Sequence, residues 1–223
     1  LIKRLFTMEA LLKNIEKKPF QYIGAPSLKR LFLYFQGFQL GSASAGKKVN
    51  LPMPGFQKWI ENHYKITDSG ANWVEIVSLY STDYREWFTV FFPLYRQFCN
   101  TLQDNQRLQQ VTDIDTPKEF KLYQAFSAVQ EILNEQTNSQ RIEDFSAIVD
   151  GLLFARKHFG LTPSEQEQHY HEFQTWIWQD RQLKNLFPWE RIYSFFDKTV
   201  KLEAFFDDYD RFLTEKGYPS SLG

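Results

Sequence analysis

The sequence predicts an all-α protein in which two tandem copies of a five-helix unit pack into one compact globule. Only 10 Gly and 9 Pro occur in 223 residues, so the chain lacks the turn residues that many short strands would need. Aromatic residues make up 17% of the chain and supply large apolar groups for a core. Apolar residues also recur at helical spacing, in the same order in both halves.

Four blocks of the first half return in the second half with similar gaps between them. The pairs are Phe56–Ile60 with Phe173–Ile177, Trp73–Ile76 with Trp189–Ile192, Phe91–Phe98 with Phe205–Phe212, and, in pattern only, Tyr34–Phe38 with Ile148–Leu152. Chance rarely delivers four blocks in register, so we predict one helical repeat over 8–106 and a second, acidic repeat over 107–223. Met8 begins a better helical pattern than the preceding residues, and we interpret residues 1–7 as a mis-assigned start or an artificial extension.

The apolar spacing predicts ten helices in order. The ranges are 8–18, 27–40, 54–64, 71–80 and 83–103 in the first repeat, and 117–136, 142–159, 163–180, 188–196 and 200–216 in the second. In the last helix Leu202, Phe205 and Tyr209 belong to one amphipathic stripe. Pro93 lies inside the fifth helix, which we expect to kink or restart there.

Capping residues mark several of these helix ends. Thr116-Pro117 followed by Glu119, and Thr162-Pro163 followed by Glu165, each combine an N-cap, a first-turn Pro and an acid, and Asp83 with Glu86 offers a third start. Gly160 and Gly217 stand where helices can stop. Val and Ile rarely alternate with polar residues, so no sheet is expected.

Composition excludes several classes of protein. The single Cys99 cannot form an internal disulfide, which favours a reducing compartment and predicts a cytoplasmic protein. No apolar run approaches the ~18 residues of a transmembrane helix, so no membrane partner is expected. Lys and Arg are scattered through the first half without a known basic motif, which argues against nucleic acid as a partner.

No motif for catalysis, cofactor or metal binding is recognisable. The sequence holds no glycine-rich phosphate loop and no nucleophile elbow, and Cys99 has no neighbouring His. His169 and His171 would point apart on a helix, so they do not form a metal-ligand pair. We therefore predict no catalytic residue, no metal and no cofactor.

The two halves of the chain differ in net charge, and the acidic half contains the predicted binding face. Residues 1–110 hold 14 Lys and Arg against 8 Asp and Glu, whereas residues 111–223 hold 12 against 19. The predicted partner-binding residues lie in the acidic half: Glu203, Asp207, Asp208, Asp210, Trp178 and Glu172. Three of these acids replace Pro93, Leu94 and Arg96 of the first repeat, so the outer face became acidic while the aromatic core was kept. A drifted, solvated surface would look the same, and Trp178 could instead fill a gap between the repeats.

One stretch of the chain resembles a known family. It comprises Lys17–Gly24, the following Pro26-Ser27-Leu28, the helix that ends at Gly37, and the blocks Phe56–Ile60 and Phe91–Phe98. This pattern is similar to that of immunity proteins encoded beside polymorphic or contact-dependent toxins in competing bacteria. The resemblance covers residues 8–100, and the chain departs from it at Phe20-Gln21, where the family has Gly-Met.

The resemblance implies a binder without chemistry that occludes the active site of a cognate, basic toxin domain through electrostatic complementarity. The alternative is a hydrolase or other enzyme whose acid and imidazole site lies between the repeats, with carboxylates from each repeat and His158, His169 or His171. A self-associating scaffold is a third possibility, since exposed aromatic residues can mediate a dimer. We expect a monomer or a homodimer.

Overall fold

The computed structural model describes residues 8–51, 54–67, 70–80, 86–102, 111–114, 116, 120–137, 141–185, 187–196 and 202–219. Within these ranges the protein is mostly helical and compact. Residues 1–7, the helix start predicted at Asp83, and Pro117 with Glu119 lie outside the described residues. None of the described helices has the length and apolar character needed to cross a bilayer.

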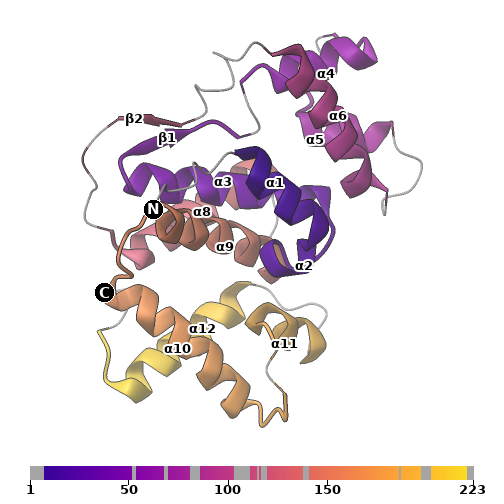
Figure 1. The fold of residues 1–223 in the computed structure, drawn as a ribbon. Helices are drawn as coiled ribbons and strands as arrows, with labels where there is room; N and C mark the ends of the chain where they lie inside the picture. The colour runs from indigo at the N-terminus through magenta and orange to yellow at the C-terminus, as the bar shows by residue number, and fades with distance from the viewer. Residues whose placement is uncertain are drawn as a thin grey trace.

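Two long helices, α3 and α9, lie side by side at the centre, and three-helix groups flank them (Figure 1). Helices α4, α5 and α6 form one group, and α10, α11 and α12 form the group on the other side. The bounds are α1 (Met8–Lys17), α2 (Pro19–Tyr22), α3 (Leu28–Ser44), α4 (Phe56–Tyr64), α5 (Trp73–Leu79), α6 (Trp87–Thr101), α8 (Leu122–Thr137), α9 (Ile142–His158), α10 (Glu165–Asp180), α11 (Trp189–Phe196) and α12 (Leu202–Lys216).

Local signals explain where several helices begin and end. Asn72 starts α5 with a capping box that includes Glu75. The N-cap of α10 is Ser164 and not the predicted Thr162, because the Glu167 carboxylate accepts the Ser164 N–H at 2.6 Å and completes a capping box there. Gly160 and Gly217 follow the ends of α9 and α12 with φ of 76° and 71°, as the sequence predicts.

Two other helices differ in detail from what was expected. Helix α6 is one continuous helix through Pro93, so it does not restart there, and α8 begins at Leu122, five residues later than predicted. The short helix α2 was not predicted, although Pro19 at its first position is a start signal. A single turn of four residues carries too little periodicity to stand out in the sequence.

The expectation that the protein has no sheet was also wrong. Strands β1 (Lys47–Val49) and β2 (Val111–Asp113) form an antiparallel pair in which Lys47 lies opposite Asp113 and forms an ion pair with it. Three-residue strands show no readable alternation, which is why the sequence did not reveal them. The pair joins the segment that follows α3 to the connection between the two halves.

The central helices approach each other backbone to backbone. A Cβ atom on Gly37 would lie 1.8 Å from the carbonyl oxygen of Ile148, and one on Gly151 would lie 2.1 Å from the carbonyl oxygen of Tyr34. In the aligned blocks Gly37 corresponds to Gly151 and Tyr34 corresponds to Ile148, so the contact is reciprocal. Only glycine fits at these two positions.

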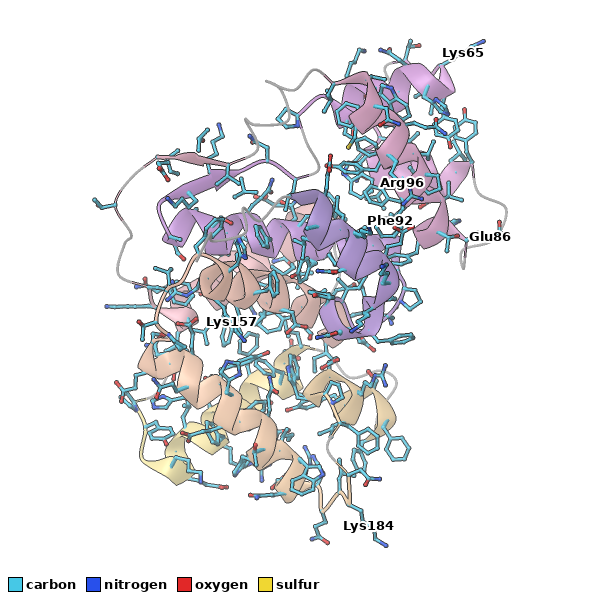
Figure 2. All side chains as sticks on the ribbon, viewed as in Figure 1. Lys65, Glu86, Phe92, Arg96, Lys157 and Lys184 are labelled. Atoms are coloured by element: carbon cyan, nitrogen blue, oxygen red, sulfur yellow. The ribbon has the colours of Figure 1, made fainter. Side chains whose placement is uncertain are left out.

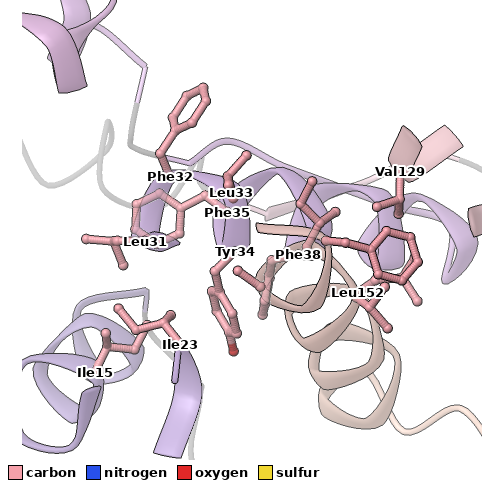
Figure 3. Close-up of a cluster of buried hydrophobic side chains, with 14 of the residues drawn as sticks. Ile15, Ile23, Leu31, Phe32, Leu33, Tyr34, Phe35, Phe38, Val129 and Leu152 are labelled. Carbon is pink, nitrogen blue, oxygen red and sulfur yellow. The ribbon is translucent and has the colours of Figure 1, made fainter. Parts of the chain in front are cut away.

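The two outer groups use the same ring contacts at aligned positions. The Phe56 ring meets that of Tyr95 at 5.4 Å between centroids, and Phe173 meets Tyr209 at 5.0 Å. Further matched contacts are Trp73–Phe91 with Trp189–Phe205, Phe56–Trp59 with Phe173–Trp176, Phe56–Phe98 with Phe173–Phe212, and Phe91–Tyr95 with Phe205–Tyr209. Around α3 the core contains Leu31, Leu33 and Phe35 (Figure 3).

Candidate functional site

The acidic face predicted on α12 is partly neutralised inside the fold. The Asp208 carboxylate accepts hydrogen bonds from Arg181 at 2.7 Å, from Arg211 at 2.9 Å and from the Tyr193 hydroxyl at 2.8 Å. Asp180 on α10 accepts two more from Arg211, both at 3.0 Å. Asp208 is therefore a structural ion-pair partner that ties α10 and α11 to α12.

The other predicted residues fall into two environments. Glu203 and Asp207 are exposed on α12, whereas Asp210 is half-buried. Glu172 on α10 accepts a hydrogen bond from the Tyr218 hydroxyl at 2.8 Å. Trp178 is half-buried against the core and does not stand out as an exposed anchor. The structure places all six on the neighbouring helices α10 and α12, but among arginines that reduce the negative charge.

A second candidate site is a cavity of about 970 Å³ between the α2 segment and helices α9, α10 and α11. Both halves of the chain line it. Its wall carries two carboxyl groups, those of Asp150 on α9 and Glu190 on α11, together with the phenol of Tyr34 on α3. Cavities of this size that combine apolar walls with a few polar groups are typical of binding sites.

The surroundings of the two carboxyl groups raise their pKa values. Burial raises the pKa of Asp150 to about 8, the nearby negative charge of Glu190 adds to the increase, and a hydrogen bond from Ser146 at 3.3 Å only partly opposes it. Burial likewise raises the pKa of Glu190, while the positive charge of Arg30 acts in the opposite direction. Asp150 is thus protonated at neutral pH when the cavity is empty.

Apolar and basic groups surround the mouth of the cavity. Phe20 and Phe187 line it and expose 63% and 47% of their surface. The Arg191 guanidinium lies 5.7 Å from the centroid of the Phe20 ring and donates a hydrogen bond to the Gly24 carbonyl at 3.3 Å. Lys157 also lines the cavity and lies where α9 faces the lower group of helices (Figure 2). The rim can therefore pack against a ligand with an apolar part.

A buried ion pair stiffens the wall formed by α9 and α10. Arg156 donates to both carboxylate oxygens of Glu167, at 2.9 and 3.0 Å, and each side chain is only 5% exposed. Arg156 also donates to the Ser44 hydroxyl at 2.9 Å and lies 3.6 Å above the Phe120 ring. Burial alone would raise the pKa of Glu167, but the hydrogen bonds from Arg156 and the Ser164 backbone outweigh it and lower the pKa.

Of the three histidines in the enzyme hypothesis, the structure brings one to the cavity. His171 lines it and is exposed. His169 is buried on another face of α10, where its ring stacks on Tyr218 at 3.7 Å. His158 packs against Phe154, and burial lowers its pKa. Among the described residues no group of three or more His, Cys, Asp or Glu side chains could hold a metal ion.

No protein-family model matches this chain, and neither a curated protein nor a solved structure shows significant similarity to it. The sequence reasoning missed the cavity residues Asp150 and Glu190. One signal for Asp150 was available, because it is an acid inside the glycine-containing block where the first half has Gln36. Nothing in the sequence linked it to Glu190, which lies forty positions further along the chain.

Proposed function

We propose that this protein is a cytoplasmic immunity protein that binds a basic toxin domain and occludes its active site. The observation that carries the proposal is the cavity, which combines the carboxyl groups of Asp150 and Glu190 with exposed phenylalanine rings at its mouth. Such a combination suits a protruding basic segment of a partner, because aromatic residues and desolvated charges dominate binding energy. The resemblance of residues 8–100 to immunity proteins points to the same role.

The proposed architecture is a tandem five-helix repeat with boundaries at 8–106 and 107–223. The reciprocal contact of Gly37 and Gly151, together with the matched ring contacts of the two outer groups, supports it. Because both halves line the cavity, the glycine crossing holds its two sides in a fixed relation. A pre-organised site loses little conformational entropy on binding.

A second candidate is an enzyme that uses proton transfer in the same cavity. Asp150, Glu190 and His171 all line it, and the charge of Glu190 helps to raise the pKa of Asp150. A pair of carboxyl groups with different pKa values is a common arrangement for an acid and a base. In this candidate function the ligand binds in the same cavity, but it is converted to a product after binding.

The test is co-production of the protein with the product of the gene adjacent to its own. We expect growth of the intoxicated cells to be rescued and a complex to elute as one peak in gel filtration. The variant Asp150→Asn, Glu190→Gln should weaken both effects, whereas the matched exposed variant Glu131→Gln, Glu135→Gln on α8 should not. Absence of a complex and of rescue would refute the immunity role, and chemical modification of a ligand at the cavity would favour the enzyme.

A further inference from the structure

We propose that the cavity binds an alkylammonium or alkylguanidinium group, which is held by the carboxyl groups of Asp150 and Glu190 and by the hydroxyl of Tyr34. This inference deepens the proposed function, since it names the chemistry that the partner or a free ligand must present.

The two carboxyl groups are acceptors without a cation. No described residue forms an ion pair with Asp150 or Glu190. Arg30 comes near, since a Cβ on Gly24 would lie 2.9 Å from Nη1 of Arg30 and 3.6 Å from Oε1 of Glu190, but it makes no hydrogen bond to that carboxylate. Glu190 is buried and Asp150 is half-buried. Carboxylates withdrawn from water are normally paired, so a cavity that presents two of them favours a positively charged ligand.

Tyr34 supplies an independent sign of a missing ligand. The residue is only 1% exposed, it lines the cavity, and its hydroxyl has no hydrogen-bond partner among the described residues. Figure 3 shows its side chain extending from α3 on the side away from Phe32 and Leu33, with the hydroxyl at its far end. A buried hydroxyl without a partner costs stability, and a ligand N–H donor would satisfy it.

The walls fit the alkyl part of such a ligand. Tyr22 and Tyr34 both pack against Phe154, with ring centroids 5.6 and 6.2 Å apart, and all three residues line the cavity. Aromatic faces attract cations and also cover methylene groups. A short alkyl chain that carries a cationic group therefore finds a matching surface for both the charge and the methylene groups.

Binding of a cation should release a proton. Besides Glu190, the charged or titratable groups that act on Asp150 or line its cavity are Arg30, Lys157, Glu167, His171, Tyr22, Tyr34 and Tyr170. A bound cation favours the ionised form of Asp150, which is protonated in the empty cavity below its pKa of about 8. The heat of binding at pH 6.5 should therefore depend on the ionisation enthalpy of the buffer, as proton release to the buffer requires.

Calorimetric titration of the full chain with agmatine tests the proposal, with 1-pentanol and butyrate as the neutral and anionic controls. We expect agmatine to bind and both controls to fail. Asp150→Asn with Glu190→Gln should weaken binding by roughly tenfold or more, and Tyr34→Phe by a few fold. The exposed pair Glu131→Gln, Glu135→Gln on α8 should bind agmatine like the wild type.

Two further arms separate a free ligand from a partner side chain. If the group belongs to a partner, agmatine should compete with the product of the adjacent gene, and loss of one basic residue of that protein should match the loss caused by the cavity variant. If agmatine binds but does not compete, the ligand is a free amine and the proposed function is wrong about this cavity. The inference itself is overturned if agmatine binds the cavity variant with the same affinity as the wild type. It is also overturned if agmatine does not bind and the partner binds the cavity variant as tightly as the wild type.

Discussion

Gly37 of α3 touches the backbone of Ile148 on α9, and the distance of 1.8 Å from a Cβ on Gly37 to the Ile148 carbonyl oxygen leaves no room for a side chain. The same relation holds in reverse between Gly151 and Tyr34. Because Tyr34 and Asp150 are each within three residues of one of these glycines, the crossing also sets the distance between two groups of the cavity wall.

Substitution of Gly37 by Ala should therefore destabilise the protein. The added methyl group must push α3 and α9 apart, and overpacking of this kind costs about 1–3 kcal/mol, occasionally more. Urea unfolding of Gly37→Ala measures the loss. The neighbouring variant Gln36→Ala serves as the control, because this half-buried position tolerates a good helix former. Equal stability of Gly37→Ala and the wild type would contradict the observed crossing.

Removal of Arg156 should be costly, because it leaves Glu167 as a buried charge without its partner. We expect Arg156→Met to lose about 3–5 kcal/mol. The exposed pair of Arg96 with Glu16 is the matched control, and Arg96→Met should lose at most about 1 kcal/mol.

The Arg156–Glu167 pair also has a pH signature. The folded-state pKa of Glu167 is lowered, so its stabilisation is present above the ordinary value of 4.5 and is lost as the pH falls through the folded-state pKa. The difference in stability between wild type and Arg156→Met should accordingly shrink in acid. A constant difference down to pH 3 would speak against the pair as its cause.

Asp208 and Asp207 should behave differently although they are neighbours. Asp208→Asn weakens its contacts with Arg181, Arg211 and Tyr193 and should cost about 1–3 kcal/mol. Asp207→Asn changes an exposed carboxylate and should remain within about 0.5 kcal/mol of the wild type. Chemical denaturation of both variants at neutral pH decides the matter, and equal losses would mean that the ion-pair network does not form.

Asp150 should make the protein less stable as the pH rises. Its pKa is about 8 in the fold against an ordinary value of 3.8, so between these values the folded state holds a proton that the unfolded state has released. Stability should then fall with a slope approaching about 1.4 kcal/mol per pH unit, and Asp150→Asn should remove that slope. Unfolding measured from pH 5 to 8 tests this, with Glu203→Gln as a variant that leaves the slope unchanged.

Most helices could be predicted from the sequence because their signals are local. The stripe of Phe205 and Tyr209 and the glycines that follow α9 and α12 act within a few residues, and α9 and α11 lie within one residue of the expected bounds. The three-residue strands and α2 are too short for such a signal. For α10 the sequence analysis predicted a cap at Thr162, whereas Ser164 caps the helix because its capping box with Glu167 forms in the structure.

The functional surface was much harder to predict. The acids of α12 are visible as a charged face, but Arg181 and Arg211 neutralise Asp208 only once α10 and α12 pack together. Asp150 and Glu190 come to one cavity because α9 packs against α11, which no local pattern encodes. Raised pKa values likewise depend on burial, and burial is a property of the packed molecule.

The contact between the backbones of α3 and α9 makes the two halves of the molecule depend on each other for folding. If the two halves separated, each would expose the long apolar face that flanks its glycine. Heating should therefore unfold both halves in a single transition. A protease that nicks the chain between the halves should produce two fragments that co-purify and still enclose the cavity.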